Sequence, residues 1–334
     1  MRMAIRRRQC GKPEVRARQE SRPILNLFLL KLEAVSCSLC GSGDAELAMK
    51  VPSLRLPGDL WFELRRCRSC GLVYLSPRPV DEVMAELYQP QHYTAPRQDL
   101  VRRLEGMITN ERVTFVNKHT PGRRLLDVGC GNGGFVIAMA AAGYDVFGLE
   151  PYQGTSDALP EALRSRIEHT PFAAANYPKE HFDLITFWHV LEHLAQPVET
   201  LQRIRGFLKR EGRLIVEVPN LACRESNWLG PYWYNLDAPY HFWHFTPQTL
   251  EAIVHKAGFE VTTVVTSAVT RPVWLLNYLL LGASVAAKRW QALHPVWGNW
   301  PRANLALGLA MCAGGRVLFA GSCPMMRVVA RIGA

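Results

Sequence analysis

Three side chains that can transfer protons or bind metal lie within five residues of each other in the stretch WHVLEHL: His189, Glu192 and His193. If this stretch is helical, spacings of three and four residues place all three along one face. Imidazole suits a general base near neutral pH, and two imidazoles with a carboxylate suit a divalent metal ion. Two more histidines, His241 and His244, follow in HFWHFTPQTL.

Four cysteines occur as two CxxCG motifs, CSLCGS and CRSCGL, separated by 26 residues. A spacing of two residues lets both sulfurs of a pair reach one tetrahedral ion, and the glycine after each pair permits the tight turn that this requires. We therefore predict that Cys37, Cys40, Cys67 and Cys70 hold one structural Zn2+. Because protein supplies all four ligands, the site is closed to substrate.

A glycine-rich loop lies in RRLLDVGCGNGGFVIAMAAAGYDVFGLEP, which we interpret as strand, loop, helix and second strand. Gly129, Gly131 and Gly134 satisfy the pattern GxGxxG, and Glu150 lies at about the spacing of ~20 residues expected for a ribose-binding carboxylate. A nicotinamide dinucleotide is therefore one cofactor that this stretch could bind.

The surrounding residues favour a different cofactor. With Asp127 two positions before the first glycine, the motif DVGCGNG resembles motif I of the class I S-adenosylmethionine-dependent methyltransferases. The resemblance extends over residues 36–267 and is closest to members with an N-terminal zinc-binding CxxC pair and a core like that of the ubiquinone-biosynthesis O-methyltransferases. It implies an α/β Rossmann-like fold, with a seven-stranded, mostly parallel sheet, an antiparallel last strand and a small N-terminal zinc knuckle.

The resemblance also implies a cofactor site. The loop backbone approaches the methionine part of S-adenosylmethionine, and Glu150 accepts hydrogen bonds from the ribose hydroxyls. The implied cofactor-binding residues are Asp127, Gly129, Cys130, Gly131, Gly133, Glu150, Pro151 and His189. In 166–178 the chain lacks the acidic residue that commonly binds the adenine amino group, so the adenine contacts stay unassigned.

The resemblance implies catalytic residues as well: His189, Glu192, His193 and His241. His189 follows the predicted fourth strand and is expected to face the cofactor as a general base. In a branch of the superfamily, an ExxEH helix and a distant histidine hold a divalent ion beside the acceptor oxygen, and these four residues are the counterpart here. A simpler alternative is that Glu192 and His193 only stabilise local structure.

The chain divides into segments of different composition. Residues 1–33 hold nine Lys or Arg and three acidic residues, so most of the net charge of +10 lies on this tail. We expect six segments: a basic, disordered tail at 1–33, a zinc-binding knuckle at 34–79, a helical linker at 80–120, the methyltransferase core at 121–270, an apolar insertion at 271–323 and the last core strand at 324–334.

The apolar insertion has two interpretations. It contains the apolar stretch VWLLNYLLLGASVAA, followed by basic residues and tryptophans. This stretch is shorter than the ~20 apolar residues needed to span a bilayer. It forms either a helical hairpin on the core or an element lying in a membrane surface, and we favour the membrane surface. Because paired thiolates suit a reducing compartment, we expect a cytoplasmic protein associated peripherally with the inner face of the membrane.

Together these features predict an S-adenosylmethionine-dependent methyltransferase. The expected acceptor is a hydroxyl or carbon of a small molecule, or of a lipid-linked glycan or quinone. An RNA methyltransferase is one alternative, but the basic residues lie on the tail and not in a stripe with aromatic residues, so nucleic acid is not the expected partner. A catalytically inactive methyltransferase fold that serves as a binding module is the other.

Overall fold

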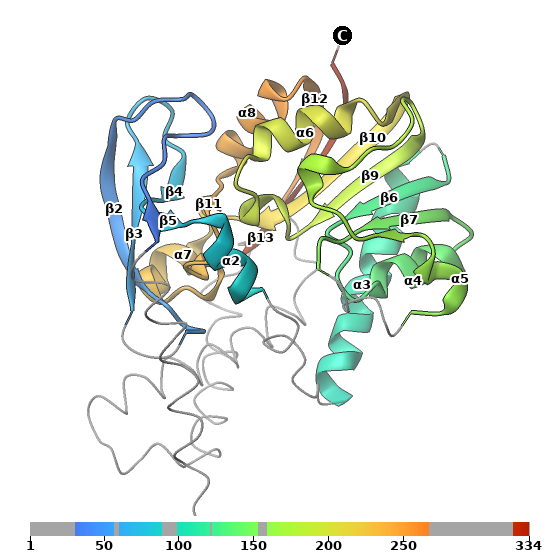
Figure 1. Ribbon diagram of the computed structural model, residues 1–334, viewed down its shortest axis with the longest axis horizontal. Helices are drawn as coiled ribbons and strands as arrows, with labels where there is room; N and C mark the ends of the chain where they lie inside the picture. The colour runs from blue at the N-terminus through green and yellow to red at the C-terminus, as the bar shows by residue number, and fades with distance from the viewer. Residues whose placement is uncertain are drawn as a thin grey trace, which may run out of the picture.

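The computed structural model describes residues 31–56, 60–88, 99–120, 122–152, 159–266 and 323–333. Its main element is a seven-stranded sheet in the order β12-β13-β10-β9-β6-β7-β8 (Figure 1). The strands are β6 (Arg124–Val128), β7 (Asp145–Leu149), β8 (Ile167–Glu168), β9 (Phe182–Trp188), β10 (Leu208–Pro219), β12 (Phe259–Val265) and β13 (Met325–Ile332).

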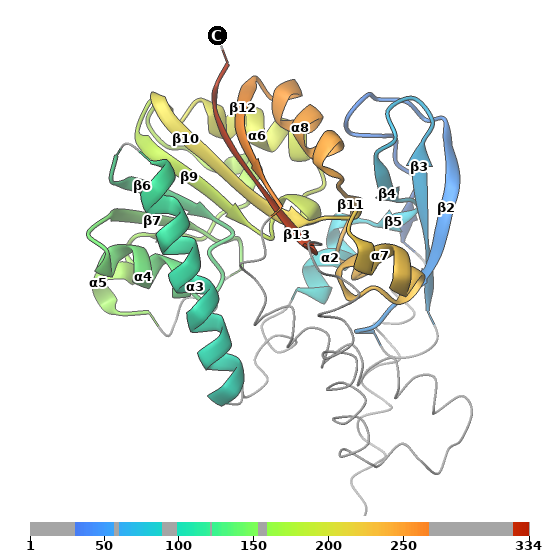
Figure 2. The ribbon, with the colours of Figure 1, turned by 180° about the vertical axis from the view of Figure 1, so that it is seen from behind.

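Alternating side chains of these strands pack against helices on the two faces of the sheet. The helices are α3 (Asp99–His119), α4 (Gly134–Ala141), α5 (Glu161–Arg164), α6 (Pro197–Arg205) and α8 (Pro247–Lys256). Leu125 and Val329 belong to a hydrophobic cluster with α3 and α4, whereas their neighbours Leu126 and Val328 belong to another with α6 and α8. Figure 2 shows α3 crossing one face of the sheet. Strands buried on both faces explain why successive apolar residues such as Leu125 and Leu126 are both fully buried.

The direction of β13 identifies the type of sheet. It runs antiparallel to both of its neighbours, β10 and β12, whereas β6, β7, β8 and β9 are parallel. A dinucleotide-binding sheet has six parallel strands in the order 3-2-1-4-5-6, without an antiparallel strand inserted near one edge. The predicted fold class, with an antiparallel last strand, is therefore confirmed.

A second sheet lies next to the two CxxC motifs. It has the order β11-β4-β3-β2, formed by β2 (Ala45–Pro52), β3 (Trp61–Cys67), β4 (Val73–Leu75) and β11 (Trp243–His244). The first motif precedes β2, and the second joins β3 to β4. Strand β1 (Leu32–Glu33) pairs with β5 (Arg78–Pro79), and the short helix α2 (Asp81–Leu87) follows. Strand β11, which pairs with β4, comes from the predicted methyltransferase core, so this sheet joins strands from 45–75 to residues 243–244.

Two predicted segments lie almost wholly outside the described residues: the basic tail at 1–33 and the apolar insertion at 271–323. Their predicted disorder and membrane contact therefore remain predictions. Among the helices in the described part of the chain, none is both long enough and apolar enough to cross a bilayer.

Candidate functional site

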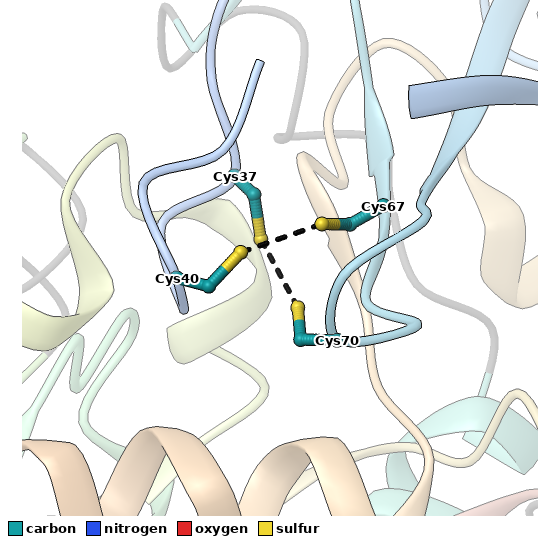
Figure 3. A group of neighbouring side chains, drawn as sticks. All are labelled: Cys37, Cys40, Cys67 and Cys70. Atoms are coloured by element: carbon teal, nitrogen blue, oxygen red, sulfur yellow. Dashed lines mark hydrogen bonds between the residues drawn. The ribbon is translucent and has the colours of Figure 1, made fainter. Parts of the chain in front are cut away.

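The four cysteines of the CxxCG motifs converge on one point (Figure 3). The Sγ atoms of Cys37 and Cys70 are 3.4 Å apart, as are those of Cys40 and Cys67. Four sulfurs at ~2.3 Å from a tetrahedral Zn2+ would be about 3.8 Å from one another, so these separations are close to those of a zinc site. The predicted ligands thus fit the ion in both number and type.

The backbone around the cysteines supports this fit. Gly41 and Gly71 have φ of +78° and +77°, and their amides donate to the carbonyls of Cys37 and Cys67 at 2.8 and 2.9 Å. Only glycine adopts this left-handed conformation without strain. Burial opposes the thiolate of Cys67, but backbone amides, that of Cys70 first, lower its pKa to about 7, whereas burial raises the pKa of Cys37 and of Cys70. A thiolate stabilised by amides is the form that binds zinc.

The glycine loop has the backbone that the sequence predicts. Gly129, Gly131 and Gly133 all have positive φ, at +70°, +53° and +73°. A Cβ at Gly129 would come within 2.4 Å of Val190, and one at Gly133 within 2.5 Å of Leu159, so these two glycines permit close packing. A Cβ at Gly131 would meet no atom within 4 Å. Gly131 is therefore the loop residue whose backbone faces open space.

Glu150 points toward this loop. Its Oε2 accepts a hydrogen bond from the backbone N–H of Gly131 at 2.9 Å, and its Oε1 accepts one from Tyr152 at 3.2 Å. The residue is only 7% exposed, and this burial raises the pKa of its carboxyl group above the usual value. Glu150 and the loop thus form one local unit at the carboxyl end of the parallel strands, where α/β sheets bind their ligands.

The other predicted cofactor residues differ in position. Asp127 is buried, and its Oδ1 accepts from Thr186 at 2.7 Å; burial raises its pKa to about 7. Cys130 is also buried, so its side chain belongs to the core and only its backbone belongs to the loop. Pro151 directly follows Glu150 and is partly exposed, and His189 follows β9.

Substitution of Gly131 by alanine is expected to impair cofactor binding beyond its effect on stability. Gly143→Ala is the matched control, because Gly143 has φ of +85° and equally open surroundings but follows α4, away from the loop. Both variants should lose about 1–2 kcal/mol of unfolding free energy from left-handed strain. Isothermal titration with S-adenosylmethionine should show a loss of about tenfold or more for Gly131→Ala only. Equal affinities in the two variants would contradict this role of the loop.

The stretch WHVLEHL is not one helix, so the condition for placing His189, Glu192 and His193 along one helix face is not met. His189 follows β9 in a left-handed conformation, with φ of +58°, and its amide donates to the carbonyl of Glu217 at 3.0 Å. Residues Leu191–His193 then form a single turn of 3-10 helix. The left-handed residue reverses the chain at the end of the strand, so His189 and Glu192 meet through this turn and not along a helix face.

The ring of His189 lies between two buried carboxylates. Its Nδ1 is 3.3 Å from Glu192 Oε1, and its Nε2 is 3.2 Å from Glu217 Oε1. Burial alone would lower the pKa of His189, but the hydrogen bonds and charges of the two carboxylates raise it to about 9. Because both ring nitrogens already face carboxylates, His189 directs no free nitrogen at an acceptor, which argues against it as the general base.

Glu192, His193 and His241 form a compact cluster in which one ligand atom of each lies within 4.8 Å of the others. Nδ1 of His193 is 2.9 Å from the carbonyl of Tyr240, and Nδ1 of His241 is 2.8 Å from the carbonyl of Asn235. Because a carbonyl only accepts, Nδ1 carries the hydrogen and Nε2 presents a lone pair in each ring, and Tyr88 Oη, 2.7 Å from the same Nδ1 of His193, then acts as an acceptor. This pattern is typical of histidines that bind metal.

The cluster contains polar atoms without partners. Glu192 is fully buried, yet its Oε2 has no hydrogen-bond partner among the described residues, and the same is true of the Nε2 of nearby His244. Burial lowers the pKa of both His193 and His241 to about 4. Neutral imidazoles beside a desolvated carboxylate oxygen are a donor set that suits a divalent cation.

One residue of this site was missed by the sequence analysis. Tyr88, at the end of α2, places its Oη 2.7 Å from Nδ1 of His193 and stacks on Tyr152 with ring centroids 5.1 Å apart. Its edge also meets the ring of Tyr240, at 5.5 Å. Tyr88 thus lies between the cofactor strand and the histidine cluster. No local signal marks it, because its partners are distant in the sequence and it lies within the segment at 80–120 predicted to be a helical linker.

Comparison with known proteins identifies the domain. Residues 99–264 match the protein family described as "Methyltransferase domain". The chain carries a methyltransferase domain. The match begins with α3 and ends within β12, so the methyltransferase domain includes the glycine loop, Glu150 and the histidine cluster.

Curated relatives of the methyltransferase domain have different substrates. The tRNA U34 carboxymethyltransferase of Pseudomonas putida (strain W619) is 30% identical over 168 residues, which cover 45% of this chain and 49% of the relative. The ubiquinone biosynthesis O-methyltransferase of Glaesserella parasuis is 30% identical over 129 residues, which cover 34% of this chain and 53% of the relative. The chain spans about a third to about half of the length of the curated relatives it matches.

Solved structures resemble the chain more distantly. A SAM-dependent methyltransferase from Archaeoglobus fulgidus is 16% identical with a TM-score of 0.45, covering 68% of this chain and 93% of that structure. The [4+2]-cyclase SpnF is 19% identical with a TM-score of 0.43, covering 67% of this chain and 82% of that structure.

Proposed function

We propose that the protein transfers a methyl group from S-adenosylmethionine to a hydroxyl or carbon of a small molecule, or of a lipid-linked glycan or quinone. The observation that carries the proposal is the arrangement of Glu150 against the amide of Gly131. A buried carboxylate beside an open loop backbone suits a ligand that presents ribose hydroxyls and a positively charged chain to the same edge of the sheet.

The residues around this edge suit an in-line displacement. Bound S-adenosylmethionine supplies a methyl group on a sulfonium, whose thioether is a good leaving group. The protein must align the acceptor, exclude water and accept the proton that an acceptor hydroxyl releases. Tyr152 lies two residues after Glu150. Its ring stacks on that of Tyr88, whose hydroxyl contacts His193. The acceptor is expected to lie on this side of the cofactor.

Two experiments test the proposal: the first measures cofactor binding, and the second measures transfer of the methyl group to an acceptor. Isothermal titration with S-adenosylmethionine and with NAD separates the two cofactor classes, and we expect binding of S-adenosylmethionine only. Incubation with methyl-labelled cofactor and a lipid extract, a sugar-nucleotide pool or an RNA pool then identifies the acceptor. Label in the lipid or small-molecule pool supports the proposal. Binding of NAD alone would contradict it.

Two outcomes would favour the alternatives. Label in RNA alone would indicate an RNA methyltransferase, an alternative that the relatives named tRNA U34 carboxymethyltransferases keep open. Cofactor binding without label in any pool would favour a binding module. In each case the cofactor site stands and the acceptor assignment changes.

We further propose that Glu192, His193 and His241 hold a divalent cation beside the acceptor. His189, the fourth predicted ligand, is excluded from this set because both of its ring nitrogens already face carboxylates. The lone pairs of His193 and His241 and the unpartnered Oε2 of Glu192 support the proposal. When bound, such an ion would lower the pKa of an acceptor hydroxyl as a Lewis acid.

His241→Ala is expected to abolish binding of this second ion and to leave the Zn2+ predicted at the four cysteines in place. After loading with Zn2+ and desalting, mass spectrometry of the metal should give about two ions per chain for the wild type and about one for His241→Ala. His255→Ala, an exposed histidine on α8, is the control and should keep both. A wild-type value of about one, with methyl transfer unaffected by chelator, would rule the second site out.

A further inference from the structure

The segment that carries His241 and His244 contributes β11 to the sheet β11-β4-β3-β2, which we call the zinc-bearing sheet after the ion that the neighbouring cysteines are predicted to hold. Strand β11 pairs antiparallel with β4, with Trp243 opposite Tyr74 and His244 opposite Val73. Strand β4 begins three residues after Cys70, so the second CxxC turn leads directly into the strand that β11 joins. In Figure 1, β11 lies where this sheet meets the methyltransferase domain.

A series of hydrogen bonds continues from this sheet into the histidine cluster. The amide of Leu75 donates to the carbonyl of Phe242 at 2.8 Å, and the amide of Phe242 donates to the carbonyl of Glu192 at 2.8 Å. The indole N–H of Trp243 donates to the carbonyl of Leu194 at 2.7 Å. Residues 191–194 are therefore fixed to residues 242–243, which are themselves fixed to β4.

Two side chains from the N-terminal part of the chain contact the histidine cluster or the loop that leads into it. Tyr88 contacts His193, as described above. Arg55, which follows β2, lies with its guanidinium 2.6 Å from Asp237 Oδ2 and 4.9 Å from the centre of the Tyr240 ring. Because Asp237 is buried, this ion pair orders the loop that leads into His241.

The glycine loop and Glu150, which form the predicted cofactor site, are positioned by contacts of the large sheet. The amide of Gly129 donates to the carbonyl of Leu149 at 2.7 Å, and the amide of Gly131 donates to Glu150. These residues lie at the ends of β6 and β7, inside the seven-stranded sheet. The glycine loop thus draws its geometry from the large sheet, whereas the histidine cluster draws its geometry from both sheets.

We infer that the zinc-bearing sheet is a positioning element of the acceptor half of the site, so that loss of metal from the four cysteines displaces the histidine cluster and leaves cofactor binding intact. The inference rests on the proposed function for its role in methyl transfer. The arrangement itself can be tested without an acceptor.

The test is hydrogen exchange of the full chain, loaded with one Zn2+ per chain and stripped by a chelator. We expect stripping to speed exchange by about tenfold or more in 61–75, 191–194 and 240–245, but not in 124–150, since local opening exposes only the amides it releases. The affinity for S-adenosylmethionine should change less than about twofold. Unchanged exchange in 240–245 would overturn the inference, as would equal acceleration in 124–150.

A substitution that leaves the cysteines untouched provides a second measurement. Trp243→Phe removes the indole hydrogen bond to Leu194 while keeping an aromatic ring in the same buried position. With zinc bound, it should speed exchange in 191–194 and leave 124–150 unchanged. Trp61→Phe, on the exposed face of β3, is the control and should alter neither segment. If Trp243→Phe behaves like the control, the hydrogen bond from Trp243 to Leu194 does not position residues 191–194. Failure of methyl transfer in every pool would leave these results unaffected.

Discussion

Glu150→Ala is expected to weaken S-adenosylmethionine binding by about 100-fold or more, because the two charge-assisted hydrogen bonds that we propose Glu150 accepts from the ribose would contribute about 1.5–3 kcal/mol each. In the protein alone, the same carboxylate accepts from the amides of Gly131 and Tyr152. Its removal therefore also frees the backbone that faces the cofactor. Isothermal titration measures the effect directly.

Two further variants separate this effect from a general loss of stability. Glu150→Gln keeps the shape of the side chain but not its charge, so its affinity for S-adenosylmethionine should fall between those of the wild type and Glu150→Ala. Glu161→Ala removes a carboxylate that is 87% exposed on α5 and should bind the cofactor normally. Near-normal affinity in Glu150→Ala would mean that this carboxylate does not bind the ribose.

Arg327→Met is expected to cost about 3–5 kcal/mol of unfolding free energy, because breaking a buried ion pair leaves a charge without its partner. Arg327 on β13 lies opposite Glu217 on β10 and forms an ion pair with it, and it also pairs with Glu111 on α3. Glu217 in turn accepts from Arg112. These cations hold the pKa of Glu217 well below its usual value despite complete burial.

The same strand offers a control. Arg331→Met removes an arginine that is half exposed and paired with Glu260, so it should cost about 0–1 kcal/mol. Urea unfolding monitored by fluorescence gives both values, and an unchanged m-value would show that the denatured states are comparable. If the two variants cost the same, the buried network does not hold α3 to the sheet. Because Glu217 also contacts His189, Arg327→Met should shift the pKa of His189 as well.

The sequence by itself determined the features that depend on neighbouring residues. Two CxxCG motifs specify a four-sulfur site, since each turn places its own pair of thiols. Glycines with positive φ specify the loop between β6 and α4, and Glu150 follows at a distance fixed by one helix and one strand. The order of strand, loop, helix and strand around these glycines was predicted because short-range geometry decides it. The full sheet was implied by the family resemblance and is confirmed, whereas the cofactor role of the loop and Glu150 stays a prediction.

Only the tertiary structure decided what His189, His193 and His241 can do. The spacing of WHVLEHL fits a helix face, but the left-handed turn at His189 and its contact with Glu217 on β10 overrule that pattern. The pKa of His189 rises and that of His241 falls because of partners and burial that no local pattern encodes. Tyr88 and β11 likewise enter the site through contacts between distant segments. Side-chain charge and position depend on which segments pack together, and that is set by the whole fold.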